Sequence, residues 1–397
     1  MSLDHVFGHH DARTLEQARD VAARAHRFAL MADGHVGYVM PIGGVAAYRG
    51  QISPIGVGVD IACGNAAILT DLTAEDLAGR LEELADEIAG SIGFGLGRPV
   101  NRSDDAPVDH PLFDDGAWEV LPASVRDELR ERARGQLGTV GGGNHYVDVF
   151  ADEAGRVWVG VHFGSRGLGF ITAHGFVARA QGRAWRDLNP ARSADMNREV
   201  LLDADSELGR DYWAAMELAG RYAYAGREWV ARTVTRMMGA RELDLVHNHH
   251  NFAWKETHSG EELVVVRKGA TPAFPGQRGF VGGSMGDVSV ILRGTDVSQP
   301  TLCSTVHGAG RVMGRRQAKG RWKKGKLVKP GAVSPEDMAR ATEGVVLRGG
   351  DLDEAPQVYR KLERVLEAQG GTIEVLHRLT PLIVCMAPAR SRDPYRD

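Results

Sequence analysis

Clustered glycines set the strongest limit on how this chain folds. The 397 residues contain 50 glycines, about twice the usual share, with runs such as Gly141-Gly-Gly143 and Gly282-Gly283. Glycine is favoured where the backbone turns tightly or approaches a ligand closely. Short runs rich in valine and isoleucine lie between the clusters and predict strands. The pattern therefore indicates short strands joined by tight loops, with binding sites expected in the loops.

The remaining segments favour helices. Helical apolar spacing predicts helices over residues 14–31, 73–91, 122–135 and 335–344, and Ser334-Pro-Glu-Asp337 is a typical helix start. Residues 174–239 contain few glycines and prolines, and predict two or three helices in an outer layer. Strands are expected over residues 66–69, 146–150, 157–162, 262–267, 288–292 and 382–386. Strands interrupted by helical insertions predict a mixed α/β or α+β fold with central mixed sheets.

The cysteine usage and the absence of long apolar runs indicate a cytoplasmic protein. The three cysteines, an odd number spread from Cys63 to Cys385, do not form a disulfide framework, and the N-terminus has no apolar run behind a basic start. No stretch reaches the roughly 18 apolar residues that a membrane span needs. We therefore expect a reduced, cytoplasmic protein without a membrane partner.

A carboxylate and a thiol three residues apart predict a metal site. Asp60 and Cys63 lie in one glycine-rich loop, and His145, His162 and the cluster His247-Asn-His-His250 supply imidazoles. Any one of these residues is equally typical of a small buried side chain or a core histidine. Together, imidazoles, one thiolate and one carboxylate suit Mn, Fe, Co or Zn. Because the candidates span most of the chain, we expect one catalytic domain over residues 1–397, with a helical insertion at about 174–239 and a frayed tail from about 389.

A second group of residues suits phosphate chemistry. His307 is followed by small residues, with Arg311 and Arg315 four and eight positions further on. A nucleophilic histidine at phosphorus needs access, an orienting partner and positive charge for the leaving group. The run Arg311–Lys329 carries nine basic residues and no acid, which suits a polyanion. The alternatives are an ordinary glycine-rich turn and a solvated basic loop.

Ten motifs, in order along the chain, resemble those of the RtcB family of RNA-splicing ligases. They are Asp33-Gly-His-Val-Gly-Tyr38, Pro41–Ala47, Gly56–Gly64, Gly143-Asn-His145, His162–Gly167, His250-Asn251, Arg267–Thr271, Gly283–Gly286, His307–Arg311 and Asp353–Pro356 with Tyr359. The resemblance implies one α+β ligase domain. It also implies an enzyme that joins an RNA 3′-phosphate or 2′,3′-cyclic phosphate to a 5′-hydroxyl, in tRNA splicing or RNA repair.

The resemblance also implies cofactors and roles for individual residues. GTP and two Mn²⁺ ions would be used, with a guanylyl group carried on His307 and then on the RNA end. Cys63 would bridge the two ions, and His250 is preferred to His247 because it precedes an asparagine and lies eight residues before His258, although His247 also precedes an asparagine. The implied metal ligands are Asp60, Cys63, His145, His162 and His250. The implied nucleotide contacts are Asn144, Asp148, Ser284, His307, Gly308, Ala309, Gly310 and Tyr359, and the implied phosphate or RNA contacts are Lys268, Arg311 and Arg315.

The chain departs from the family pattern around the nucleotide. Asp148 stands where the family commonly has glutamate, and Ala387-Pro388 replaces a terminal Lys-Gly whose lysine contacts guanine. Gly283, Gly314 and Arg360 replace a proline, a serine and a lysine. Two alternatives follow: a divergent paralogue that binds metal and RNA ends or hydrolyses cyclic phosphates with weak guanylylation, and an enzyme with altered nucleotide preference. The RNA substrate, the oligomeric state and the need for an activating protein partner stay open.

Overall fold

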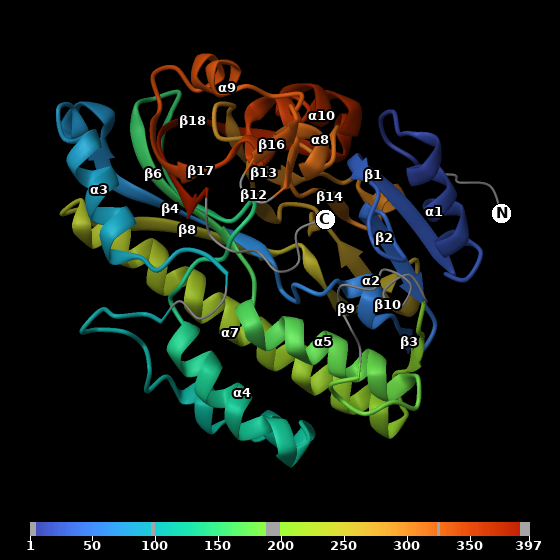
Figure 1. The fold of residues 1–397 in the computed structure, drawn as a ribbon. Coiled ribbons are helices and arrows are strands. Elements are labelled where there is room, and N and C mark those ends of the chain that lie inside the picture. The colour runs from blue at the N-terminus through green and yellow to red at the C-terminus, as the bar shows by residue number, and fades with distance from the viewer. Residues whose placement is uncertain (1–4, 97–99, 188–198, 324–325, 390–397) are drawn as a thin grey trace.

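The computed structural model describes residues 5–96, 100–187, 199–323 and 326–389, and it has the mixed α+β fold expected from the sequence (Figure 1). The part of the frayed tail that begins at 390 lies outside the described residues. The α-helices are α1 Ala12–Ala22, α2 Pro54–Val57, α3 Leu81–Ser91, α4 Ala123–Gln136, α5 Arg166–Ala180, α7 Glu207–Met237, α8 Arg315–Lys319, α9 Pro335–Ala341 and α10 Leu362–Gln369.

A mixed sheet forms the centre of the molecule. Its strand order is β12-β13-β18-β5-β6-β4-β8, and β17 pairs with β18 in parallel while the other neighbours are antiparallel. Its strands are β4 Gly64–Thr73, β5 Tyr146–Asp152, β6 Arg156–Phe163, β8 Glu242–His249, β12 Arg278–Val281, β13 Ser289–Gly294, β17 Val346–Gly350 and β18 Ile373–Pro388.

A second sheet lies beside the first, and its strand β1 contains Asp33. Its order is β1-β2-β10-β9, all antiparallel. Its strands are β1 Arg27–His35, β2 Ile42–Tyr48, β9 Asn251–His258 and β10 Glu261–Lys268. Three further pairs are β3 Gln51–Ile52 with β7 Leu202–Asp203, β11 Ala270–Pro272 with β14 Ser304–Val306, and β15 Arg321–Lys323 with β16 Lys326–Lys329.

Side-chain alternation gives the central sheet two different faces. On one face, Val147 and Val149 of β5 pack with Val230 and Val234 of α7, which runs along the sheet beneath β4 and β6 (Figure 1). Successive residues of a strand point to opposite faces. Tyr146 and Asp148 of β5 therefore face away from α7, and they line one cavity together with the loops that follow β12 and β14.

Strand register brings distant loops to one end of this sheet. Gly64 at the start of β4 lies opposite Phe163 at the end of β6 and His249 at the end of β8. In antiparallel neighbours, the start of one strand meets the end of the next. The residues beside these three positions therefore gather at one edge, and they include Cys63 and His162.

All six predicted strands are confirmed, whereas several helix boundaries were wrong. The expected helix over 14–31 ends at Ala22, because Arg27–His35 forms β1 and pairs with β2. The segment over 73–91 divides into a 3₁₀ turn at Ala74–Leu77 and α3. The helix predicted over 335–344 ends at Ala341. In the outer layer, α5 begins before residue 174, at Arg166, and residues 188–198 lie outside the described part.

Candidate active site

Four of the five predicted metal ligands meet around Cys63 within hydrogen-bonding distance. The Cys63 Sγ atom lies 3.5 Å from His145 Nε2 and 3.3 Å from His162 Nε2, and His145 Nε2 lies 3.1 Å from Asp60 Oδ2. The donor atoms of Asp60, Cys63 and His145 lie within 4.8 Å of one another, and so do those of Cys63, His162 and His250. Cys63 belongs to both groups, which is the arrangement that a bridging thiolate requires.

The surroundings of these groups favour a neutral His162, a neutral His250 and an ionised Asp60. Burial, and then the neighbouring positive charges, hold the pKa values of His162 and His250 well below their usual range. Burial alone would raise the pKa of Asp60, but its hydrogen bond with His145 lowers it. Burial and the Asp60 charge raise the pKa of the Cys63 thiol. A cation at this position would reverse that last effect, because thiolates are the metal-binding form of cysteine.

Close backbone packing holds the two ligand loops together. Ala62, just before Cys63, has a left-handed φ of 61°. A Cβ atom added to Gly164 would lie 2.2 Å from Asp60 Oδ1, so any other residue there would displace the carboxylate. Arg227 of α7 is fully buried and donates to the Ala62 carbonyl at 2.9 Å and the Phe163 carbonyl at 2.6 Å. These contacts fix the backbone on both sides of the candidate metal ligands.

The three neighbouring histidines occupy different environments. His250 follows β8 and stacks edge-on with His162, with ring centroids 5.1 Å apart. Arg227 donates instead to Nε2 of His247, at 2.8 Å, and its guanidinium group lies 2.9 Å from Nδ1 of His249. His250 is therefore the histidine of this cluster that joins the group around Cys63.

His307 is oriented by a carboxylate far away in the sequence. Its Nδ1 atom lies 2.5 Å from Oδ2 of Asp33, the fully buried residue near the end of β1. The same oxygen accepts the backbone N–H groups of His307 and Gly308, at 3.0 and 3.3 Å. Although burial opposes it, the contacts with His307 lower the pKa of Asp33. A proton held on Nδ1 leaves Nε2 as the ring nitrogen with a free electron pair.

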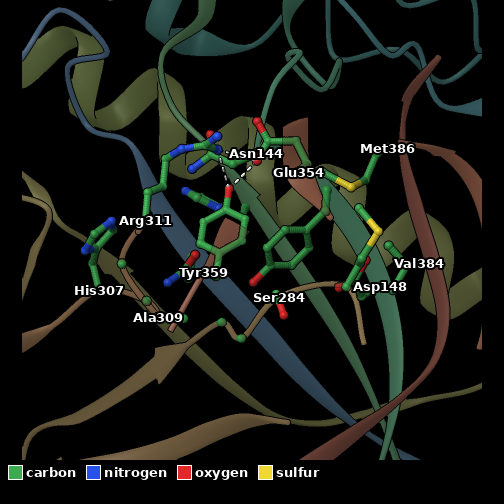
Figure 2. A pocket seen from close by; sticks show the side chains of 18 of the residues that line it. Asn144, Asp148, Ser284, His307, Ala309, Arg311, Glu354, Tyr359, Val384 and Met386 are labelled. Atoms are coloured by element: carbon green, nitrogen blue, oxygen red, sulfur yellow. Dashed lines mark hydrogen bonds and ion pairs between the residues drawn. The ribbon is translucent and has the colours of Figure 1, made fainter. Parts of the chain in front are cut away.

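Two cavities meet at His307. The first, called the metal cavity below, is lined by Asp60, Cys63, His145, His250 and Lys268 among others. The second, called the nucleotide cavity below, is lined by the residues that the sequence predicted to contact a nucleotide. Asn144, His162 and His307 line both cavities. The second cavity also brings together all eight predicted nucleotide contacts (Figure 2): Asn144, Asp148, Ser284, His307, Gly308, Ala309, Gly310 and Tyr359. His307 therefore lies where this cavity meets the one that holds the candidate metal ligands.

The glycine-rich loops form the wall of the second cavity. Gly282 and Gly308 form an isolated backbone bridge, so the loops after β12 and β14 lie side by side. Ser284 lies in the first of these loops, on the cavity wall. Successive backbone N–H groups in such loops are suited to an anion.

Arg311 and Arg315 reach the cavity but are paired with acidic residues. Arg311 contacts Glu354 at 3.1 Å and the Tyr359 hydroxyl at 3.0 Å, and Arg315 contacts Asp353 at 2.9 Å and also Glu354. The basic run contains no acid, yet the fold supplies acids from residues 351–354. Part of its charge is therefore already neutralised within the fold.

Lys268 lies in the metal cavity and not on an exposed surface. Its Nζ atom donates to the backbone carbonyls of Tyr38, at 2.5 Å, and Ile55, at 3.1 Å. Burial lowers the pKa of Lys268 to about 7. The ammonium group therefore loses its proton near neutral pH, and it does so beside the candidate metal ligands.

Sequence reasoning assigned no role to Asp33, Arg227 and Glu354. Asp33 occurs in a motif of the resemblance, but 274 positions separate it from His307. Arg227 lies inside the helical insertion, where a basic residue is ordinarily solvated. Ala387, where the family lysine was expected, lies on a strand that presents Val384 and Met386 to the cavity, and it does not line the cavity itself.

A histidine that lies between a group of possible metal ligands and a glycine-walled cavity is typical of a metal-dependent enzyme that acts on phosphate groups. Comparison with known proteins identifies its family. Residues 15–387 match the family model described as tRNA-splicing ligase RtcB. The chain is 34% identical to the RNA-splicing ligase RtcB of Escherichia coli, with 90% of this chain and 89% of that protein covered. It is 32% identical to the tRNA-splicing ligase RtcB of Archaeoglobus fulgidus, covering 93% and 90%, and 30% identical to the RNA-splicing ligase RtcB of Mycobacterium bovis, covering 89% and 95%.

The chain belongs to the RtcB family of RNA ligases, and its substrate is RNA. Within the described residues, none of the helices combines the length and the apolar character needed to cross a membrane.

Proposed function

We propose that the chain joins RNA 3′-phosphate or 2′,3′-cyclic phosphate ends to 5′-hydroxyl ends, using GTP and two Mn²⁺ ions. The observation that carries the proposal is the position of His307. Its ring is held by Asp33 and lines both the metal cavity and the nucleotide cavity. A single catalytic domain over residues 1–397 is part of the proposal, because the site residues come from segments spread along the chain.

Two cation positions fit the side chains around Cys63. Asp60, Cys63 and His145 would hold one ion, and Cys63, His162 and His250 the other. The Nδ1 atoms of His145 and His250 have no hydrogen-bond partner within the described residues, although both are buried. Imidazole and carboxylate ligands are compatible with manganese, and cations here would draw negative charge from a nearby phosphate.

The chemistry of His307 can be written as a balanced displacement. The Nε2 electron pair forms a bond to the α-phosphorus of GTP, and the bond from that phosphorus to the bridging oxygen breaks with release of pyrophosphate. The Nδ1 proton stays on the ring, where Asp33 offsets the positive charge that develops. Preorganised donors and charges around the phosphates lower the barrier most when they are already in place before reaction.

The RNA ends react in the two steps that follow. An oxygen of the RNA 3′-phosphate attacks the guanylyl phosphorus, and the N–P bond breaks with its electron pair returning to Nε2. The RNA 5′-hydroxyl oxygen then attacks the activated RNA phosphorus and releases GMP and a proton. A 2′,3′-cyclic end is first opened by water to the 3′-phosphate.

The other proposed residues surround these reacting groups. Asn144, Ser284, Tyr359 and the Gly308-Ala309-Gly310 loop would hold the nucleotide. Lys268 in the metal cavity would face a phosphate. Arg311 and Arg315 would contact the nucleotide phosphates or the RNA from positions set by Glu354.

Covalent labelling tests the proposal. Incubation with α-labelled GTP and Mn²⁺ should give an acid-labile label on the wild type and none on His307→Ala. His377→Ala, an imidazole outside both cavities, is the matched control and should be labelled like the wild type. A label that survives in His307→Ala would contradict the assigned nucleophile. Ligation of 3′-phosphate RNA to 5′-hydroxyl RNA by the same variants should follow the label.

A further inference from the structure

The end of the nucleotide cavity that lies away from His307 is mostly apolar. Met285, Val384 and Met386 line it, and they belong to one buried apolar cluster with Tyr146. Asp148 lies on the same face of the sheet, beside Val384 and Met386 (Figure 2). An apolar slot with few polar groups is the usual setting for a flat aromatic ligand such as a nucleobase.

Asp148 brings an unused hydrogen-bonding atom to this slot. Its side chain is 6% exposed, and Oδ1 is buried without a hydrogen-bond partner among the described residues. The basic side chains that line the cavity, Arg311 and Arg315, are bound to Glu354. Burial raises the pKa of Asp148 well above its usual range, and a backbone hydrogen bond from Cys385 offsets this only in part. Burial, the unpartnered Oδ1 atom and the pairing of both cavity arginines with Glu354 together favour the neutral carboxylic acid over the carboxylate.

A neutral carboxylic acid recognises a base edge differently from a carboxylate. It offers one donor and one acceptor side by side, whereas a carboxylate offers acceptors alone. The adenine edge presents an acceptor, N1, beside a donor, the 6-amino group. The guanine edge presents two neighbouring donors, N1–H and the 2-amino group, to a carboxylate. When the acid instead pairs with guanine O6 and N1–H, the 2-amino group is left in the apolar slot, and an unpaired buried donor weakens binding.

We propose that Asp148 binds the base as a neutral donor and acceptor pair, and that adenine fits this end of the cavity, so that ATP serves as a nucleotide donor to His307 alongside GTP. The inference rests on the proposed function and names its nucleotide class. With ATP the bonds made and broken are those given above, and AMP takes the place of GMP on Nε2. Asp148 is thus the residue that sets base preference.

Side-by-side labelling with α-labelled ATP, GTP and UTP tests the inference. In the wild type, the initial rate with ATP should be within about tenfold of the rate with GTP, a difference below about 1.4 kcal/mol. UTP should label far more slowly, because a pyrimidine leaves the slot partly empty. A rate with ATP more than about a hundredfold below that with GTP would overturn the inference while leaving the proposed function intact. Absence of label with every nucleotide would overturn the proposed function.

Two substitutions at Asp148 separate the neutral acid from a carboxylate. Asp148→Asn keeps one donor and one acceptor, so the ratio of the ATP and GTP rates should stay within about threefold of the wild-type ratio. Asp148→Leu removes both groups and should lower both rates by about tenfold or more. Asp205→Asn makes the same chemical change at an exposed carboxylate outside this cavity, and should alter neither rate. Selective loss of the GTP label in Asp148→Asn would mean that an ionised Asp148 reads guanine, and would refute the inference.

Discussion

Oδ2 of Asp33 lies 2.5 Å from Nδ1 of His307 and also accepts two backbone N–H groups from the start of the loop that carries the histidine. One oxygen therefore fixes both the ring and the backbone beneath it. Because Asp33 is fully buried, this contact has little competition from water. The orientation of Nε2 towards the two cavities depends on it.

Replacing Asp33 by asparagine should slow labelling of His307 more than it weakens nucleotide binding. An amide cannot stabilise the positive charge that develops on the ring and favours the wrong tautomer. By analogy with other buried carboxylate–histidine pairs, the rate should fall about 10²–10⁴-fold. Single-turnover labelling at saturating nucleotide measures the rate, and its concentration dependence measures binding.

The matched control for this change is Asp71→Asn, because Asp71 also accepts a backbone N–H, at 2.7 Å from Arg241, but on the surface away from the site. It should label at the wild-type rate. A wild-type rate in Asp33→Asn, with the variant folded by circular dichroism, would show that the carboxylate does not position the nucleophile.

Metal stoichiometry should depend on which ligand is removed. Cys63 belongs to both donor groups, whereas Asp60 belongs to one and His250 to the other. Cys63→Ser should therefore weaken binding at both positions, while Asp60→Ala or His250→Ala should each weaken one position. Calorimetric titration of chelator-treated protein with Mn²⁺ gives the number of sites and their affinities.

The other two cysteines supply a control for the thiol. Cys303 and Cys385 are buried and free like Cys63, but they lie outside the metal cavity. Cys385→Ser should bind manganese as the wild type does. If Cys63→Ser keeps both sites at unchanged affinity, a bridging thiolate is excluded.

The strands were predictable from sequence because alternating or continuous apolar runs specify them locally. Residues 14–31 show where that reasoning fails. Their apolar spacing is compatible with a helix, but pairing of Phe28 with Ala46 and of Ala29 with Val45 stabilises a strand over the second half. Such pairing partners are set by the tertiary fold, and local propensity does not contain them.

The candidate site was predictable in its residue types but not in its electrostatics. Motifs identified His307 and the residues around Cys63, because unusual side chains recur at characteristic spacings. No spacing could reveal that Glu354 neutralises Arg311 and Arg315, since these charges meet only after the chain folds. The unpartnered Oδ1 atom of Asp148 is likewise a property of the packed cavity.

Arg227 should be needed for stability and for metal binding together. It donates to the Ala62 and Phe163 carbonyls, which flank Cys63 and His162. Arg227→Lys cannot reach both carbonyls and both neighbouring histidines with one ammonium group. Loss of these buried hydrogen bonds should cost about 3 kcal/mol of unfolding free energy and lower manganese affinity. Arg232→Lys, on the same helix but in surface ion pairs, should change stability by less than about 1 kcal/mol.

Urea unfolding of the metal-free protein measures the stability of the Arg227 and Arg232 variants, and titration with Mn²⁺ measures affinity. Equal stability and affinity in Arg227→Lys and wild type would mean that the two carbonyls find other donors. Reduced stability with normal metal affinity would limit Arg227 to a structural role.

The final prediction concerns pH and the buried pair His258 and Glu256, whose Nε2 and Oε2 atoms lie 2.7 Å apart. The contacts with Cys303 and then Glu256 raise the pKa of His258 to about 9. A folded pKa above the unfolded value of about 6.5 means that protonated His258 stabilises the fold. That stabilisation is complete below about pH 6.5 and is lost as the pH rises through 9, with a span of roughly 3 kcal/mol.

Urea unfolding at pH 6, 7.5 and 9.5 should therefore show a larger fall in stability for the wild type than for His258→Gln. The difference between the two proteins is the relevant measure, because other groups also titrate in this range. Glutamine keeps a hydrogen bond to Glu256 but does not titrate, which makes it a better choice than alanine. Glu256→Gln is unsuitable alone, since it would leave Arg267 buried without its carboxylate partner. Parallel stability curves for wild type and His258→Gln would show that the pKa of His258 is the same in the folded and unfolded protein, and that its contact with Glu256 does not favour the protonated ring.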